Sequence, residues 1–172
     1  MPPPARTPEQ RKRDVLDRLG RDVDAWVATA DPSTGAPYMV PLSFLWEATS
    51  SSGAHPPPSE GRAPLGGPSL LVATPSASVT GRNLRASGVV RVGVGDTRDV
   101  IMIDGLVEAL EAAELPGGTA EAFAAKAGFD PRSQAEHYLY FRVRPSRIQA
   151  WREVNELRGR DVMRDGDWLV PG

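Results

Sequence analysis

The stretch Ser69–Arg85 reads Ser-Leu-Leu-Val-Ala-Thr-Pro-Ser-Ala-Ser-Val-Thr-Gly-Arg-Asn-Leu-Arg, and it predicts a buried strand that turns directly into a helix. The apolar run at its start has the length and composition of a strand buried on both faces. Pro75 ends that strand. Ser76 or Ser78 is then placed to cap a short helix that continues to the end of the stretch.

The start of this helix is also a candidate phosphate site. A helix N-terminus presents free backbone N–H groups and the positive end of the helix dipole. Four hydroxyl side chains and two cationic ones lie close to it in the sequence: Thr74, Ser76, Ser78, Thr80, Arg82 and Arg85. Because hydroxyl-rich turns also serve as plain helix caps, the phosphate cradle and the structural cap both stay open at this point.

Composition excludes several classes of protein. The length of 172 residues predicts one domain over 1–172 with a sizeable core. Cysteine is absent, which rules out disulfides, a thiol nucleophile and cysteine-based metal sites. The net charge of −2 gives no reason to expect nucleic-acid binding. No secretory signal or long apolar span is seen, so we expect a cytoplasmic protein without membrane contact.

The N-terminal region predicts a helix behind a flexible arm. Residues 1–6, with three prolines in a row, indicate the arm. Thr7-Pro8-Glu9-Gln10 supplies an N-cap, a first-turn proline and a capping-box glutamine, and Gly20 is expected to end the amphipathic helix. The basic run at 11–13 is offset by nearby aspartates, which indicates a solvated helix face.

A period of two then predicts a hairpin. Residues 24–30 form one strand and 37–47 its partner, in which the even-numbered side chains share one face and the odd-numbered ones the other. Pro41 lies inside the second strand. Since proline cannot donate to a ladder, we expect a sheet edge or a bulge at that point.

Residues 48–68 are rich in Ser, Pro and Gly, and they predict a surface loop between strands. His55 within this loop is expected to be solvated, because no other residues are spaced to join it as metal ligands. The sequence therefore predicts no metal site.

The remaining elements alternate between short strands and one helix. Strands are expected at 89–95, 99–110, 137–143 and 147–151, and Pro145 is expected to separate the last two. A hairpin is expected at 162–169. A helix is expected at 119–127, capped by Thr119 and ended by Gly128. Gly105 is expected to mark a bulge or a close backbone approach. Six to eight short strands with two or three helices predict a mainly β, α+β fold, an antiparallel barrel or sandwich with peripheral helices.

The order of these elements resembles a known family. The resemblance, over 7–169, is carried by the sequence of short motifs Gly35, Pro37, Val40-Pro41-Leu42, Ala73-Thr74, Arg82-Asn83-Leu84 and Ile103-Asp104-Gly105. Together they resemble the pyridoxamine-phosphate-oxidase-like split barrels, which bind flavin or deazaflavin. The fold so implied is an antiparallel split β-barrel of the FMN-binding type.

The resemblance implies a homodimer with cofactor sites at its interface. The ring would lie against the second strand, the phosphate near the strand-to-helix turn, and a Trp and an Arg would arrive from the other subunit. The residues carried over are Val40, Pro41, Leu42 and Ser43 for the ring, Thr74, Thr80, Arg82 and Asn83 for the phosphate end, and Trp151 and Arg160 from the closing segment.

Two departures from the family's pattern bear on function. The Arg-Lys pair that holds the flavin phosphate in vitamer oxidases aligns with Val79 and Thr80, which leaves FMN, a deazaflavin or no cofactor open. In the closing segment a substrate-binding cation aligns with Glu156, which would repel a dianionic phosphate. We therefore expect no efficient oxidation of pyridoxamine phosphate.

The sequence thus predicts an FMN-dependent oxidoreductase acting on a small organic substrate. A deazaflavin-dependent reductase and a non-catalytic flavin- or ligand-binding module are the alternatives. No Ser-His-Asp set, carboxylate pair or metal cluster is evident in the sequence, and no catalytic residue can be named.

Overall fold

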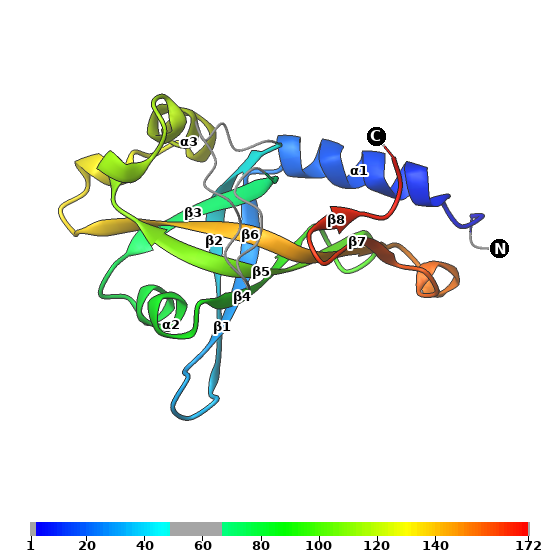
Figure 1. Cartoon of the computed structure of the whole chain (residues 1–172), viewed down its shortest axis with the longest axis horizontal. Helices are drawn as coiled ribbons and strands as arrows, with labels where there is room; N and C mark the ends of the chain where they lie inside the picture. Colours follow the sequence, from blue (N-terminus) through cyan, green and yellow to red (C-terminus); the bar gives the residue numbers. More distant parts are fainter. Residues whose placement is uncertain (1–2, 49–66, 172) are drawn as a thin grey trace, which may run out of the picture.

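The computed structural model describes residues 3–48 and 67–171 (Figure 1). Most of the loop expected at 48–68, including His55, lies outside the described residues. Within them eight strands form one sheet of order β3-β2-β1-β4-β5-β6-β7-β8. The strands are β1 Asp24–Ala30, β2 Pro37–Glu47, β3 Ser69–Pro75, β4 Val89–Val94, β5 Val100–Leu110, β6 Tyr138–Trp151, β7 Asp161–Arg164 and β8 Asp167–Trp168.

The barrel closes through β3, the strand predicted from the opening stretch. One of its sides pairs with Phe44–Glu47 of β2, and the other pairs with Tyr138–Val143 of β6. Six strands, β1 to β6, therefore form a closed antiparallel barrel, and β7 and β8 extend it beyond β6. The fold class expected from the sequence is confirmed.

Helices and short 3-10 turns surround the barrel. They are α1 Pro8–Arg21, α2 Val79–Ser87, α3 Thr119–Ala127, η1 Ala112–Glu114, η2 Pro131–Ser133 and η3 Val154–Glu156. The capping box of α1 is present, since Thr7 accepts from the Gln10 N–H and the Gln10 side chain accepts from the Thr7 N–H. Ser78 caps α2, as expected. Thr119 does not cap α3, because Gly118 in a left-handed conformation takes that place.

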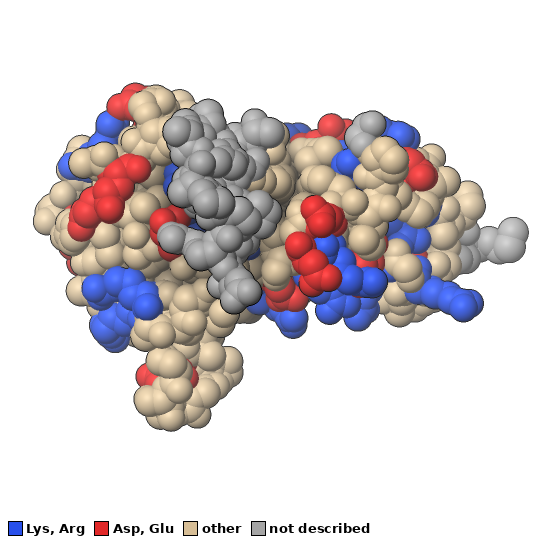
Figure 2. Space-filling model, in the orientation of Figure 1, with Lys and Arg blue, Asp and Glu red and all other residues tan. Residues whose placement is uncertain are grey.

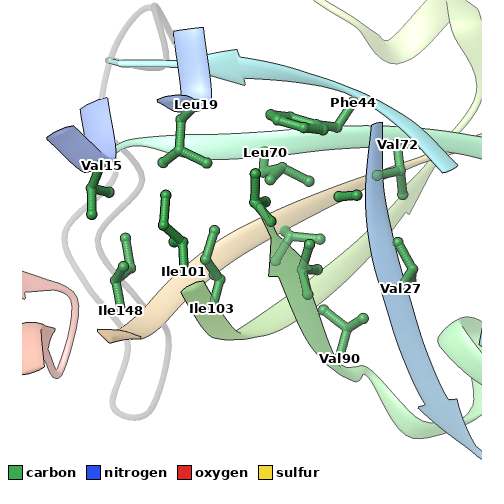
Figure 3. Packing of buried hydrophobic residues seen from close by; sticks show 14 of the residues in the cluster. Val15, Leu19, Val27, Phe44, Leu70, Val72, Val90, Ile101, Ile103 and Ile148 are labelled. Atoms are coloured by element: carbon green, nitrogen blue, oxygen red, sulfur yellow. The ribbon is translucent and has the colours of Figure 1, made fainter. Parts of the chain in front are cut away.

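Two apolar clusters lie on the two sides of the barrel wall. The larger one fills the interior and includes Phe44, Leu70, Ile103 and Ile148, with Val15 and Leu19 of α1 closing one end (Figure 3). A smaller one, around Phe123 of α3 and Tyr140 of β6, packs outside the wall. Because both faces of β3 are covered, its first six residues are all buried.

β6 is one continuous strand, so the break expected at Pro145 is wrong. Gly105 of β5 pairs with Pro145, and the register shifts at that point to leave a bulge. A Cβ at Gly105 would lie 2.6 Å from Val143 Cγ1 and 2.7 Å from the Arg144 carbonyl oxygen. The close approach predicted for this glycine is confirmed, and the bulge lets the proline remain in the strand.

The solvated face expected for 11–13 is wrong for two of its cations. Arg11 is 5% exposed and Lys12 is 7% exposed. Arg11 donates to the Glu156 and Gly159 carbonyls at 3.3 and 2.8 Å, and Lys12 donates to the Val170 carbonyl at 2.9 Å. These partners come from the C-terminal segment, so α1 fastens that segment to the barrel.

Pro41 lies at a sheet edge, as the sequence predicts. Residues 37–43 of β2 pair with β1 alone, because the pairing with β3 begins only at Phe44. The side of β2 that faces away from β1 carries no ladder beside Pro41. The missing N–H of the proline therefore costs no strand pairing.

Candidate functional site

An apolar pocket lies on the outer face of the barrel, across strands β1, β2, β4 and β5. It has a volume of about 460 Å³, and its apolar lining includes Trp26, Met39, Gly93, Val100 and Met102. The register places Gly93 directly beside both Trp26 and Met102. The Met102 thioether lies against Gly93, since a Cβ built there would be 3.5 Å from Met102 Sδ and 3.9 Å from Trp26 Cβ.

The pocket leaves large apolar side chains in contact with water. Trp26 is 50% exposed and Met39 is 59% exposed. Val89 and Leu106, paired across β4 and β5, are also exposed on the described chain. An exposed group of this kind on a folded domain marks a surface for a ligand or a partner.

The four residues expected at the ring divide between the two faces of β2. Leu42 packs against the interior cluster, and Val40 pairs with the buried Val27. Pro41 pairs with Trp26 and so shares the outer face with the apolar pocket, while the Ser43 hydroxyl donates to Asp24 at 2.7 Å. Pro41 is therefore the member of this set that adjoins the pocket.

The β3–α2 turn, residues 75–78, brings the expected polar residues together. Thr74, Thr80 and Asn83 are all buried. The Thr74 and Ser78 hydroxyls lie 3.1 Å apart. The Asn83 amide donates to the Thr29 hydroxyl at 3.1 Å, which ties α2 to β1. The turn is thus a compact polar cluster in contact with the barrel.

The arginines of this turn bind its own backbone. Arg82 donates to the Ala77 carbonyl, and Arg85 donates to the Ser76 carbonyl at 2.9 Å. A Cβ at Gly81 would lie 2.6 Å from the Pro75 carbonyl oxygen, so the backbone is closely packed here as well. Both guanidinium groups therefore brace the turn.

Trp151 and Arg160 are brought together at the other end of β6. The Arg160 guanidinium carbon lies 5.2 Å from the centre of the Trp151 ring, within the range of a cation–π contact. Arg160 also lines a second pocket of about 260 Å³, together with Arg147, Gln149, Asp161 and Arg164. We call it the basic pocket. Sequence reasoning placed Trp151 and Arg160 in one site but missed Arg147 and Arg164.

Asp161 organises the basic pocket. It accepts from Arg164 at 2.8 Å, from Gln149 at 2.8 Å and from Arg147 at 3.1 Å. Burial alone would raise the pKa of this carboxyl, but the hydrogen bonds from these three side chains outweigh it and lower the pKa to about 2. Asp161 is therefore ionised at neutral pH.

Glu156 is buried, so the expectation that it faces a substrate phosphate is wrong. It is 2% exposed, and its carboxylate lies 2.7 Å from Arg6 Nη2. The Arg6 side chain and backbone and the Arg152 N–H all donate to this carboxylate, which lowers its pKa to about 2. Glu156 thus anchors Arg6, and with it the arm expected to be flexible, to the loop that carries Arg160.

The phosphate end and the Trp–Arg end of the expected set lie far apart in one chain. Pro75 at the turn pairs with Tyr138, the first residue of β6, whereas Trp151 is its last. Thirteen residues at about 3.3 Å each separate them, or about 43 Å along the strand. Figure 1 shows α2 and β7 on opposite sides of the molecule.

A hydrogen-bonded Ser-His-Glu line, missed in the sequence, occurs on the surface. The Ser76 hydroxyl lies 3.2 Å from His137 Nδ1, and His137 Nε2 lies 3.0 Å from a Glu111 oxygen. The His137 and Glu111 side chains are mostly exposed, and the Ser76 N–H already binds the His137 carbonyl. We interpret this line as surface hydrogen bonding that joins the β3–α2 turn to β6.

Charge elsewhere is mixed. On the face in Figure 2, acidic and basic side chains are interspersed over largely uncharged surface. Across residues 3–48 and 67–171, no group of three or more acidic or histidine side chains is placed to hold a metal ion. None of the helices in the same ranges has the length and apolar character to span a membrane.

Comparison with solved structures identifies the fold. The chain is similar to General Stress Protein 26 from Bacillus anthracis, with a TM-score of 0.54 and 15% identity over 81% of this chain and 92% of that one. It is similar to a putative pyridoxamine 5'-phosphate oxidase from Listeria innocua, with a TM-score of 0.53 and 14% identity over 84% and 98%. An F420 reductase gives a TM-score of 0.53 and 18% identity over 77% and 93%.

The chain has the split-barrel fold of these structures. The resemblance stated from the sequence is confirmed at the level of the fold. No family model and no curated protein matches the chain. At 14 to 18% identity these structures establish the split-barrel architecture, and the function of this split barrel has to be argued from its own side chains.

Proposed function

We propose that this split barrel is an oxidoreductase that binds a flavin-type cofactor as a C2 homodimer and acts on a small organic substrate. The observation that carries the proposal is the apolar pocket of Trp26, Met39, Gly93 and Met102 on an open sheet face. A flat, largely apolar ring fits against the apolar face that Trp26, Met39 and Met102 line. FMN is the first candidate cofactor.

The separation of the two ends of β6 supports a dimer. The polar β3–α2 turn and the Trp151–Arg160 pair can contact one small cofactor only if they come from different chains. The exposed side chains of Trp26, Met39, Val89 and Leu106 provide an apolar face of the kind that a second chain covers. A twofold axis would produce two equivalent sites.

The residues of the chain fit distinct tasks in such a site. A bound flavin supplies hydride or electron transfer. The apolar pocket excludes water and orients the ring, while Thr74, Thr80 and Asn83 at the β3–α2 turn are proposed to receive the phosphate end. Arg160, fixed over Trp151, supplies a positive charge beside the ring.

A deazaflavin is the second candidate cofactor, and one observation favours it. Arg82 and Arg85 both bind carbonyl groups of the turn itself. A phosphate at this turn therefore meets the charge of both arginines but fewer unengaged N–H donors than in a site whose guanidinium groups have no backbone partners. Of the compared structures, one is named an F420 reductase.

The experiment is to isolate the chain and identify its chromophore. Mass and visible absorbance separate FMN from a deazaflavin, and turnover with a reductant separates an enzyme from a flavin-binding module. We expect a bound chromophore and a dimer by light scattering. A stable monomer that retains its cofactor would contradict the dimer, and a chain that binds neither cofactor at micromolar concentration would contradict the function.

A further inference from the structure

The apolar pocket and the basic pocket adjoin on one face of the sheet. Met102 of β5 lines the first, and Gln149 of β6 lines the second. These two residues are direct cross-strand partners, which places their Cβ atoms about 5 Å apart. Val100, also in the apolar pocket, pairs with Trp151. The two pockets therefore adjoin, and we call them together the groove, with an apolar end and a basic end.

The basic end carries an excess of positive charge. Its lining includes the three arginines 147, 160 and 164 and one carboxylate, Asp161, so its net charge is +2. Arg147 and Arg164 share Asp161, and no carboxylate of the described residues lies within ion-pair distance of Arg160. Each guanidinium has five N–H donors, so donors remain after Asp161 has been satisfied.

We infer that the basic pocket binds a phosphate or carboxylate group of the small molecule that this groove accepts. Arg147, Arg160 and Arg164 would donate to that anionic group, while the flat part of the molecule lies toward Met102 and Trp26. Planar guanidinium groups bind such oxyanions through paired hydrogen bonds. The identity of the flat part of the small molecule rests on the proposed function. The anion site itself is inferred only from the three arginines of the basic pocket.

The surroundings of the pocket support an anionic ligand over a purely structural cluster. Arg147 and Arg164 are respectively 44% and 60% exposed in their side chains. They are thus accessible to a ligand while Asp161 holds them in place. Leu157 and Leu169 form apolar walls beside them, and a low-polarity wall strengthens the attraction between a guanidinium and an oxyanion.

The test is calorimetric titration of inorganic phosphate into the full chain at constant ionic strength. Chloride serves as the non-specific anion. We expect saturable phosphate binding that Arg164→Gln weakens about tenfold, the loss typical of one charge-assisted hydrogen bond. Arg98→Gln is the matched control, because Arg98 is exposed, pairs with Glu153 and lies outside both pockets. Equal phosphate affinity in the wild type and Arg164→Gln would overturn the inference.

The same titration distinguishes the two sources of the anionic group. Phosphate that binds the riboflavin-loaded chain but not the FMN-loaded chain, and that Arg164→Gln weakens, shows that the basic pocket and not the β3–α2 turn holds the cofactor's own phosphate. Phosphate that binds both loaded forms shows that the pocket serves a substrate anion. Phosphate binding by a chain that binds neither FMN nor a deazaflavin supports the anion site and contradicts the proposed function, so the two failures remain distinguishable.

Discussion

The two arginine-rich ends of the molecule use their guanidinium groups in different ways. At the β3–α2 turn, Arg82 and Arg85 donate to backbone carbonyls. At the other end, Arg6 pairs with Glu156, and Arg147 and Arg164 pair with Asp161. Carbonyl acceptors leave the full charge of an arginine in place, whereas a buried carboxylate neutralises it and depends on it in return. Removal of the Arg6 guanidinium should therefore cost far more stability than removal of the Arg82 or Arg85 guanidinium.

The largest expected effect follows the removal of Arg6. Arg6→Ala leaves the Glu156 carboxylate buried without its main partner, which should lower the free energy of unfolding by about 3–5 kcal/mol. Urea denaturation measures this. Arg98→Ala breaks an exposed ion pair instead and should cost at most about 1 kcal/mol. Similar losses in the two variants would contradict the role of burial.

Acid should weaken the same end of the molecule. The pKa of Glu156 is lowered from about 4.5 to about 2 by Arg6 and the N–H donors around it. A carboxyl with a depressed folded-state pKa stabilises the fold above its unfolded pKa, and this contribution, up to about 3 kcal/mol, is lost as pH falls from about 4.5 toward 2. Asp161 acts in the same direction.

The measurement is the free energy of unfolding against pH in wild type and Glu156→Gln. Glutamine cannot titrate, so the variant should show a smaller loss of stability between about pH 4.5 and 2. Parallel curves for the two proteins would show that other carboxyls dominate the acid response.

At the turn, the expected effect is on cofactor binding. If the β3–α2 turn holds the FMN phosphate, Arg82→Ala should weaken FMN by about 1.5–3 kcal/mol and leave riboflavin unchanged, because the charge beside the phosphate is lost. Thr74→Val should cost less. Flavin fluorescence gives both affinities. If neither variant changes FMN binding, the turn is a structural cap and its arginines only brace the backbone.

The smallest expected effect concerns the packing of the turn. Gly81→Ala would place a Cβ 2.6 Å from the Pro75 carbonyl oxygen, and relief of that contact should cost about 1 kcal/mol of stability. Gly20→Ala is the matched control in α1, where a Cβ meets no other atom within 4 Å. It should stabilise by about 0.5–1 kcal/mol through helix propensity. A thermal melt of each variant shows the sign.

Local patterns predicted the elements well. The strand that closes the barrel, the capping box at Thr7 and the close approach at Gly105 are each set by a few adjacent residues. The helix cap at 119 failed because a glycine one position earlier adopts the left-handed conformation that starts α3. The break expected at Pro145 failed because a bulge opposite Gly105 absorbs the proline.

The site was less accessible to sequence reasoning, because its partners are distant in the chain. Arg11 meets the Gly159 carbonyl 148 positions away, and Arg6 meets Glu156 150 positions away. No local sequence pattern indicates such distant pairs, so the sequence predicted a solvated side chain for Arg11 and an exposed one for Glu156. The exposure of Trp26 could have been predicted from the sequence, because strand alternation places its side chain on the opposite face from the buried Ala25 and Val27.

Closure of the barrel by β3 and β6 also has a consequence for synthesis on the ribosome. The partners of Leu70–Pro75 lie between Tyr138 and Val143, so some sixty residues must be made before that side of β3 is paired. Until then a nascent chain exposes one hydrophobic, unpaired strand edge, the kind of surface on which chains aggregate and which chaperones cover. Truncation just before Tyr138 would make that exposure permanent.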